Sequence, residues 1–209
     1  MNSDIFKTTI YLIRHGESED NKNSFLSGAR DVGLSARGKA QCIALGSVLK
    51  DTKIDHVFHS PMKRAKESAG LIFPEVKADA LPFLRELNYG EYEGFDLSQY
   101  SSSKDEIIRK WVNDPSELVF PGGDSIPEFC EYTLTELTKL AELYKGKAIA
   151  CVSHRSAIRL LAAKILHLDL GMFRRIPCSN CGITELSWNV ETGFKAESIN
   201  AVFPLIRNL

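Results

Sequence analysis

The sequence predicts an α/β fold, a three-layer αβα sandwich with helices on both faces of a mostly parallel central sheet. Short apolar runs alternate along the chain with amphipathic segments of helical periodicity. The run at 148–153, AIACVS, is apolar on both faces, as is typical of buried parallel strands. The chain has 209 residues, 44% of them apolar, and no repeat or flexible linker. We therefore expect one domain over residues 1–209.

The first half of the chain is predicted to contain two strands and two helices. Residues 8–13 form a β-branched and apolar run, which indicates a buried strand. From 35 to 50, apolar side chains fall on one helical face, and Ser35 is a suitable N-cap. A second strand is expected to end at Ser60. The helix that follows, over 60–73, is expected to use this serine as its cap and a proline in its first turn.

The second half is predicted to be richer in helix. Residues 79–103 show no clean period, and a helix over 104–113 is expected to stop before a proline. A long helix opens at Asp124 or Ser125 and runs to about Lys145. The remaining predicted elements are a strand over 148–153, a helix over 156–166, a strand over 182–188 and a further candidate strand over 194–199.

Composition excludes several function classes. The net charge is −1, so no basic field favours nucleic acid or an anionic membrane surface. No signal peptide is recognisable, and no apolar run approaches the roughly 20 residues of a membrane span. Five cysteines, an odd number, indicate reduced thiols and a cytoplasmic protein. Cys178 and Cys181 form an isolated C-x-x-C, which we interpret as structural because no further zinc ligands are placed nearby. No pattern specifies an oligomeric state.

Arginine and histidine residues, which can bind anions, follow three predicted strands. Arg14 and His15 end the first, Arg64 lies in the first turn of the helix after the second, and His154 ends the third. In open α/β sheets, ligands bind beyond the carboxyl ends of the strands. Arginines, histidines and helix N-termini gathered at one edge predict a site for phosphate or a similar oxyanion.

Six motifs, in order from about residue 10 to 188, resemble those of the histidine phosphatase superfamily, which includes the cofactor-dependent phosphoglycerate mutases. "RHGESEDN" is similar to the signature R-H-G-x-[ST]-x-x-N, and "HSPMKRAKESA" to S-P-x-x-R-A-x-x-[ST]-A. The other four are "LSGARDVGLSARGKAQ", "LRELNYGEYEG", "PGGDS" and "CVSHRSAIR". The resemblance lies closer to the phosphatase branch, with its α-ribazole-5′-phosphate and broad-specificity phosphatases.

The resemblance implies roles for matching residues. His15 would be the nucleophile and form a phosphohistidine, with its second ring nitrogen held by a hydrogen bond. Arg14 and Arg64 would hold the phosphate oxygens, and Asn21 would add a neutral donor. His154 would donate a further hydrogen bond to the transferring phosphoryl group. Neither a metal ion nor a cofactor is required, because the arginines supply the positive charge.

Two more positions are singled out by the same motifs. Glu86 would be the acid that protonates the leaving group, which requires burial or the phosphate dianion to favour its acid form. Arg155 stands where the family usually has glycine, next to the second catalytic histidine. Its side chain would close over the pocket or hold a second anionic group on the substrate, and so tune substrate choice, or else it would point into solvent.

The expected activity is metal-independent hydrolysis of a small phosphomonoester, of the histidine acid phosphatase type. A mutase would need a lid with paired arginines, whereas the stretch from 90 to 123 is short and offers Lys104, Arg109 and Lys110. Phosphoglycerate mutase is the alternative, and a non-catalytic phosphate-binding module is a third reading. The natural substrate depends on the rim loops, roughly 22–33 and 91–123, where spacing carries little information.

Overall fold

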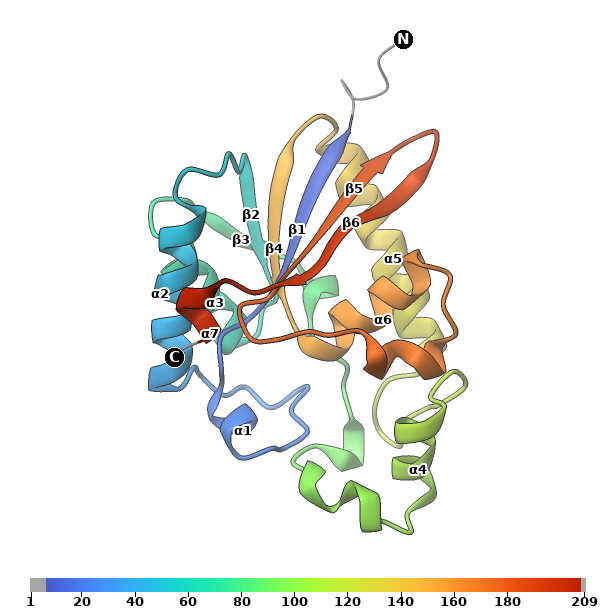
Figure 1. The fold of residues 1–209 in the computed structure, drawn as a ribbon. Coiled ribbons are helices and arrows are strands. Elements are labelled where there is room, and N and C mark those ends of the chain that lie inside the picture. Colours follow the sequence, from blue (N-terminus) through green and yellow to red (C-terminus); the bar gives the residue numbers. More distant parts are fainter. Residues whose placement is uncertain (1–6, 208–209) are drawn as a thin grey trace.

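The computed structural model describes residues 7–207 and confirms the predicted α/β class. A six-stranded sheet has the order β3-β2-β4-β1-β5-β6, with helices on both sides (Figure 1). The first four strands in this order are mutually parallel, and β5 runs antiparallel to both β1 and β6. The strands are β1 (Thr8–Arg14), β2 (His56–His59), β3 (Ala78–Ala80), β4 (Ala148–Ser153), β5 (Ile183–Asn189) and β6 (Gly193–Ala201).

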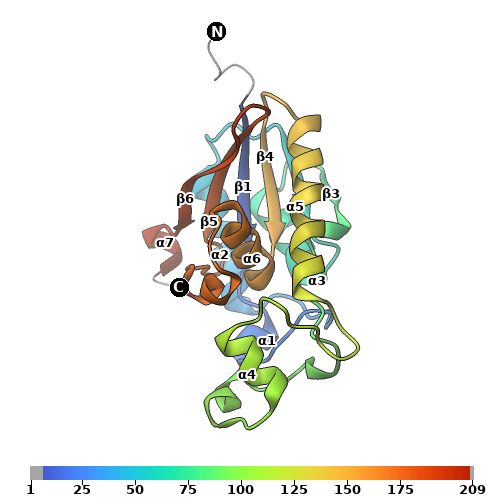
Figure 2. The same ribbon diagram turned by 90° about the vertical axis from the view of Figure 1, so that its right-hand side faces the viewer.

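Two pairs of helices form the outer layers. Helices α2 (Ala36–Leu49) and α3 (Lys63–Ile72) cover one face, and α5 (Ile126–Leu143) and α6 (Arg155–Ile165) cover the other (Figures 1 and 2). The shorter elements are α1 (Glu19–Lys22), α4 (Glu106–Asn113), α7 (Pro204–Arg207) and the 3₁₀ turns Pro82–Leu84, Gly90–Tyr92, Leu97–Ser102 and Leu170–Arg175.

Strand β4 shows why the sheet needs helices on both faces. Its side chains alternate between the two faces, as the two-residue period of a strand requires. Ile149 and Cys151 belong to the cluster formed with α5 and α6, whereas Ala150 and Val152 belong to the cluster formed with α2 and α3. All four side chains are fully buried, so β4 lies at the centre of the hydrophobic core.

Helix starts were predicted with mixed success. Ser35 is the N-cap of α2, and its hydroxyl accepts from the N–H of Gly38 at 3.0 Å, as predicted. Ser60 is not a helix cap, and this prediction was wrong. Its backbone N–H donates to Val152 at 2.9 Å, which extends the pairing of β2 with β4. The hydroxyl of Ser60 accepts from the N–H of Met62 at 3.3 Å, and α3 starts only at Lys63, after an N-cap residue, Met62, that makes no side-chain capping bond.

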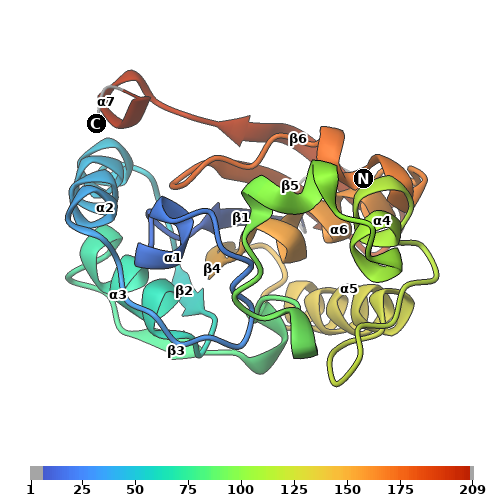
Figure 3. The same cartoon turned by 90° about the horizontal axis from the view of Figure 1, so that it is seen from below.

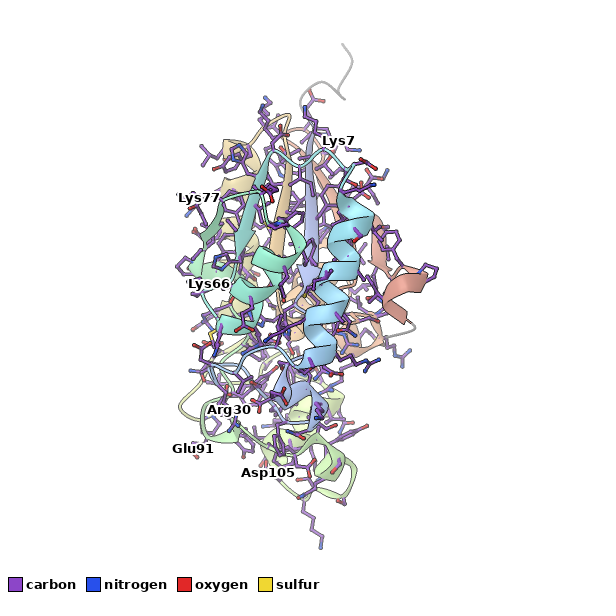
Figure 4. All side chains as sticks on the ribbon, turned by 90° about the vertical axis from the view of Figure 1, so that its left-hand side faces the viewer. Lys7, Arg30, Lys66, Lys77, Glu91 and Asp105 are labelled. Carbon is purple, nitrogen blue, oxygen red and sulfur yellow. The ribbon has the colours of Figure 1, made fainter. Side chains whose placement is uncertain are left out.

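The segment without clean periodicity lies beyond the carboxyl ends of the strands. Figure 3, a view from below, shows the 3₁₀ turns of this segment crossing these strand ends. Helix α1, from the N-terminal part of the chain, also crosses them, and α4 lies beside them. An aromatic cluster of Tyr89, Trp111, Phe120 and Phe173, with ring centroids 4.9–5.6 Å apart, joins this region to the main body. Arg30, Glu91 and Asp105 lie at this end, far from Lys7 at the other (Figure 4).

Candidate active site

The two histidines predicted to be catalytic meet because their strands are neighbours in register. Arg14, the last residue of β1, lies opposite Ser153, the last residue of β4. The next residue on each strand is a histidine, and the backbone N–H of His15 donates to Ser153 at 3.0 Å. The rings of His15 and His154 are consequently edge-to-face, with centroids 5.0 Å apart. Both rings are buried, His15 being 3% exposed and His154 0%.

His15 is held as a neutral ring with its proton on Nδ1. This nitrogen lies 2.7 Å from the carbonyl oxygen of Gly16, which can only accept a hydrogen bond. The proton therefore sits on Nδ1, and Nε2 keeps its lone pair. Burial, followed by the charges of Arg64 and Arg14, holds the pKa of His15 well below its usual value. An unprotonated Nε2 at neutral pH is what a nucleophilic imidazole requires.

His154 is held in the opposite tautomer. Its Nδ1 lies 3.2 Å from Nε of Arg64, and a guanidinium can only donate. The ring proton therefore sits on Nε2, which is buried and has no hydrogen-bond partner in the described part of the chain. Burial is the first cause of a strongly lowered pKa here too, with Arg64 next. His154 thus offers one unpaired N–H donor inside the site.

Arg14 contributes a second unpaired donor. Its Nη1 donates to the carbonyl of Cys178 at 2.8 Å and its Nη2 to Oδ1 of Asn21 at 3.2 Å. Its Nε is buried and lacks a partner among the described residues. Burial, and then the charge of Arg155, lowers the pKa of Arg14 to about 10, so it stays protonated at neutral pH. Oδ1 of Asn21 also accepts from Asn180 at 3.2 Å, which leaves Nδ2 of Asn21 as its donor.

Arg64 reaches the site, but most of its donors serve the protein itself. Besides the Nε bond to His154, Nη1 donates to the carbonyl of Arg30 at 2.8 Å. Nη2 donates to the carbonyls of Ser27 and Gly28 at 3.0 and 3.1 Å. Only one Nη1–H of the five guanidinium donors is left for a phosphate. In this structure Arg64 mainly orients His154 and anchors the 27–30 loop, and its role as a phosphate clamp stays a prediction.

The side chain of Glu86 is buried against the start of α6. Its Oε1 accepts from the backbone N–H groups of Leu87 at 3.1 Å and Ala157 at 2.9 Å, and Oε2 accepts from Ser156 at 3.1 Å. The positive end of a helix favours a carboxylate in this position. Because His154 is the N-cap residue of α6, Glu86 lies close to the paired rings. Its role as the acid stays a prediction.

A cavity of about 310 Å³ adjoins these residues. Arg14 and Arg155 lie in its wall, whereas neither His15 nor His154 does. His15 keeps a small exposed fraction, 3%, whereas His154 has none. The wall includes Arg14, Asn21, Phe25, Leu97, Arg155 and Asn180.

The segment 178–182 supports the site and escaped sequence reasoning. Its backbone makes two hydrogen bonds with the backbone of Arg14. The N–H of Arg14 donates to the carbonyl of Gly182 at 3.1 Å, and the carbonyl of Arg14 accepts from the N–H of Cys181 at 3.0 Å. Nδ2 of Asn180 donates to the carbonyl of His15 at 3.0 Å. The isolated C-x-x-C therefore contributes backbone and an asparagine, while both of its thiols are free and buried. The sequence feature that could have indicated this role is the strand that follows, at 183–189, because its first residue pairs with the end of β1.

Two features of residues 7–207 bear on other classes of function. No group of three or more His, Cys, Asp or Glu side chains is arranged to hold a metal ion there. Within the same range, no helix combines the length and apolar character needed to cross a bilayer.

Known proteins are similar to this chain in sequence and in fold. The model of the histidine phosphatase superfamily, branch 1, matches residues 10–201. A probable phosphoglycerate mutase GpmB from Escherichia fergusonii is 29% identical over 204 residues, covering 92% of this chain and 95% of that protein. A phosphoserine phosphatase mutant from Entamoeba histolytica, solved with phosphoserine, has a TM-score of 0.85 and 25% identity, covering 93% and 97% of the two chains. A putative α-ribazole-5′-P phosphatase from Escherichia coli, 24% identical, shares the fold with a TM-score of 0.78 over 93% and 96%.

Proposed function

Because this chain belongs to the histidine phosphatase superfamily, branch 1, we propose that it hydrolyses small phosphomonoesters through a phosphohistidine on Nε2 of His15. The observation that carries the proposal is the pair of opposite tautomers. One buried ring presents a lone pair, and 5.0 Å away the other presents an unpaired N–H donor. A nucleophile and a donor for the phosphoryl oxygens are the two groups that the first step needs.

In the first step, Nε2 of His15 forms a bond to phosphorus while the ester P–O bond breaks. Nε2–H of His154 and Nε–H of Arg14 are free to bind the non-bridging oxygens, and Nδ2 of Asn21 adds a neutral donor. Hydrogen bonds of this kind are typically worth about 3–4 kcal/mol each in the barrier. The proton for the departing alkoxide comes from the acid form of Glu86.

In the second step, water attacks the phosphohistidine and frees inorganic phosphate. Glu86 is now a carboxylate and takes a proton from this water, so the acid form is restored for the next cycle. The backbone N–H groups of Ser156 and Ala157, at the start of α6, and of Leu87 fit the carboxylate form well. His15 returns to its neutral state, with Nδ1 still bonded to the carbonyl of Gly16.

The stretch from 90 to 123 favours hydrolysis over phosphoryl return to the substrate. Its cations, Lys104, Arg109 and Lys110, are all exposed, and Lys110 pairs with Glu106 on α4 at 2.9 Å. They offer no paired arginines comparable to a mutase lid. Phosphoglycerate mutation remains the second candidate because relatives 29% identical to this chain are named probable phosphoglycerate mutases.

Two measurements test the proposal. A ³²P-labelled, acid-labile adduct should form on the native chain and vanish in His15→Ala, while His167→Asn, at an exposed histidine outside the site, keeps it. Incubation with 3-phosphoglycerate or p-nitrophenyl phosphate should release inorganic phosphate. Labelling of His15→Ala would exclude the nucleophile, and isomerisation of primed phosphoglycerate without phosphate release would favour the mutase.

A further inference from the structure

A group of three further arginines lies beside the active site and adds positive charge to that of Arg14 and Arg64. Arg155 is the first residue of α6, and Arg159 follows one turn later, which places both on the same side of the helix. Arg174 comes from the 3₁₀ turn Leu170–Arg175, which packs against α6. Arg155 shares the 310 Å³ cavity with Arg14, so this group adjoins the site proposed for the phosphoryl group.

The three guanidinium groups lie close enough to act on one another. Burial, and then mainly the charges of Arg155 and Arg159, lowers the pKa of Arg174 to about 10, with Tyr89 opposing. Burial also lowers the pKa of Arg159, and Arg155 adds to this effect. Like charges held together in a partly buried place are unfavourable unless an anion compensates them.

In the part of the chain that the structure describes, no carboxylate forms an ion pair with these arginines, and Glu86 acts on Arg159 only from a distance. Arg155, Arg159 and Arg174 form no ion pair there, although exposed cations elsewhere in the chain do. Nε of Arg159 and Nη2 of Arg174 are buried and without a hydrogen-bond partner among the described residues. Buried donors of this kind are rarely left unpaired, and each costs about 1–3 kcal/mol. Glu86, the nearby carboxylate, already accepts from three backbone N–H groups.

The surroundings of Arg174 explain its own position but not that of the other two. Its guanidinium lies 4.8 Å from the ring centroid of Trp111 and donates through Nε to the carbonyl of that residue at 3.3 Å. Arg174 is therefore held in place by Trp111. Arg155 and Arg159 make no such contacts with the described residues 7–207, so they are the pair available to a ligand.

We propose that Arg155 and Arg159 form a second anion subsite, and that the substrate is a small phosphomonoester carrying a further oxyanion near the ester. The inference rests on the proposed function, because it assumes that the phosphoryl group binds beside Arg14 and His15. Guanidinium groups bind carboxylate and phosphate by the same forked hydrogen bonds. A cavity of 310 Å³ lies at the lower end of the range for ligand sites, which suits a short carbon chain between the two anions.

Matched substrates separate the second anion from the ester. 3-Phosphoglycerate and glycerol 3-phosphate differ at the carboxylate, which is replaced by an uncharged hydroxymethyl group. 1,3-Propanediol bisphosphate and 3-hydroxypropyl phosphate differ in the same way at a second phosphate. The native chain should prefer the doubly anionic member of at least one pair in kcat/KM. Arg155→Met and Arg159→Met should each reduce that preference by about 10-fold or more, the usual loss for a hydrogen bond between charged groups.

The variants and controls keep the outcomes distinct. Arg109→Met, at an exposed arginine on α4, should leave the preference unchanged. Loss of preference within only one pair identifies the second anion as carboxylate or as phosphate. An unchanged preference in both arginine variants would overturn the inference, while labelling of His15 would still support the proposed hydrolysis.

A binding measurement covers the case in which no ester is hydrolysed. Calorimetric titration of the His15→Ala chain with each pair gives the same preference as a ratio of Kd values, without turnover. Adding Arg155→Met or Arg159→Met should reduce that ratio by a similar factor. Equal Kd values for the two members of each pair in His15→Ala would reject the subsite, whatever the activity of the native chain.

Discussion

His15 and His154 lie with their ring centroids 5.0 Å apart, and their hydrogen-bond partners fix opposite tautomers. A carbonyl, which only accepts, holds Nδ1 of the first ring. A guanidinium, which only donates, holds Nδ1 of the second. Two neighbouring histidines thereby acquire different chemistry from one bond each, and neither needs a charge to do so.

Nuclear magnetic resonance should detect this difference directly. In a long-range ¹H–¹⁵N correlation spectrum at pH 7, His15 should show the Nδ1–H pattern and His154 the Nε2–H pattern. Arg64→Met removes the donor to His154, so the tautomer of this ring should no longer be fixed while that of His15 is kept. Identical patterns for the two native rings would contradict the assignment.

Stability should fall as the solution is acidified below about pH 6.5. The pKa of both rings is well below the usual value in the folded chain, so below that pH the unfolded chain binds protons that the folded chain does not. Each ring then removes about 1.4 kcal/mol of unfolding free energy per pH unit, until the pH reaches its folded-state pKa. Urea unfolding between pH 5 and 8 measures this slope.

The same slope should be smaller in variants that lack one ring. His15→Asn and His154→Asn should each remove about one proton from the difference between the two states, whereas His167→Asn serves as the control outside the site. A slope that is the same in all three variants would show that the buried rings do not stay neutral on folding.

Replacing Glu86 should affect poor leaving groups most. Glu86→Gln removes the acid, so hydrolysis of alkyl phosphates should fall by about 10²–10⁴-fold, while p-nitrophenyl phosphate, whose leaving group needs no proton, should lose much less. Steady-state kinetics on both esters give the comparison.

Glu93→Gln is the matched control for that experiment. Its carboxylate also accepts from backbone N–H groups, those of Gly28, Ala29 and Tyr89 at 2.9–3.2 Å, but it anchors the rim. Both variants should lose stability, and only Glu86→Gln should discriminate between the esters. Equal losses on the two esters in Glu86→Gln would leave the acid unassigned.

Close backbone packing behind His15 should make Gly38 intolerant of a side chain. A Cβ at Gly38 would lie 2.0 Å from the carbonyl oxygen of Glu17, so Gly38→Ala must displace backbone next to the nucleophile. We expect a loss of about 1–3 kcal/mol in unfolding free energy, together with lower activity. Gly70→Ala, in α3, meets nothing within 4 Å and should stabilise the chain by about 0.5–1 kcal/mol. Thermal unfolding of the two variants should shift in opposite directions.

The sequence was most informative where neighbouring residues determine structure. Apolar periodicity located the long helices and the strands of the sheet, and motif order brought His15 and His154 to one edge. Both depend on local pattern, which a single chain displays. The cap at Ser35 was predicted for the same reason.

Features that depend on distant partners escaped prediction. Ser60 failed as a cap because its hydroxyl accepts from the N–H of Met62 while β2 is still paired with β4, and α3 starts only at Lys63. Asn180 gave no signal, since its contact with His15 arises from the antiparallel placement of β5 beside β1. Arg64 was matched to phosphate, yet most of its donors meet carbonyls of a loop more than 30 residues away.

These carbonyls link the length of the 27–30 loop to the position of Arg64 in the active site. The guanidinium of Arg64 donates to the carbonyls of residues 27, 28 and 30 and also, through Nε, to Nδ1 of His154. An insertion or deletion in the 27–30 loop would therefore also disturb the hydrogen bond that fixes the tautomer of His154. New specificities are therefore expected to arise here by exchanging side chains on a backbone of constant length.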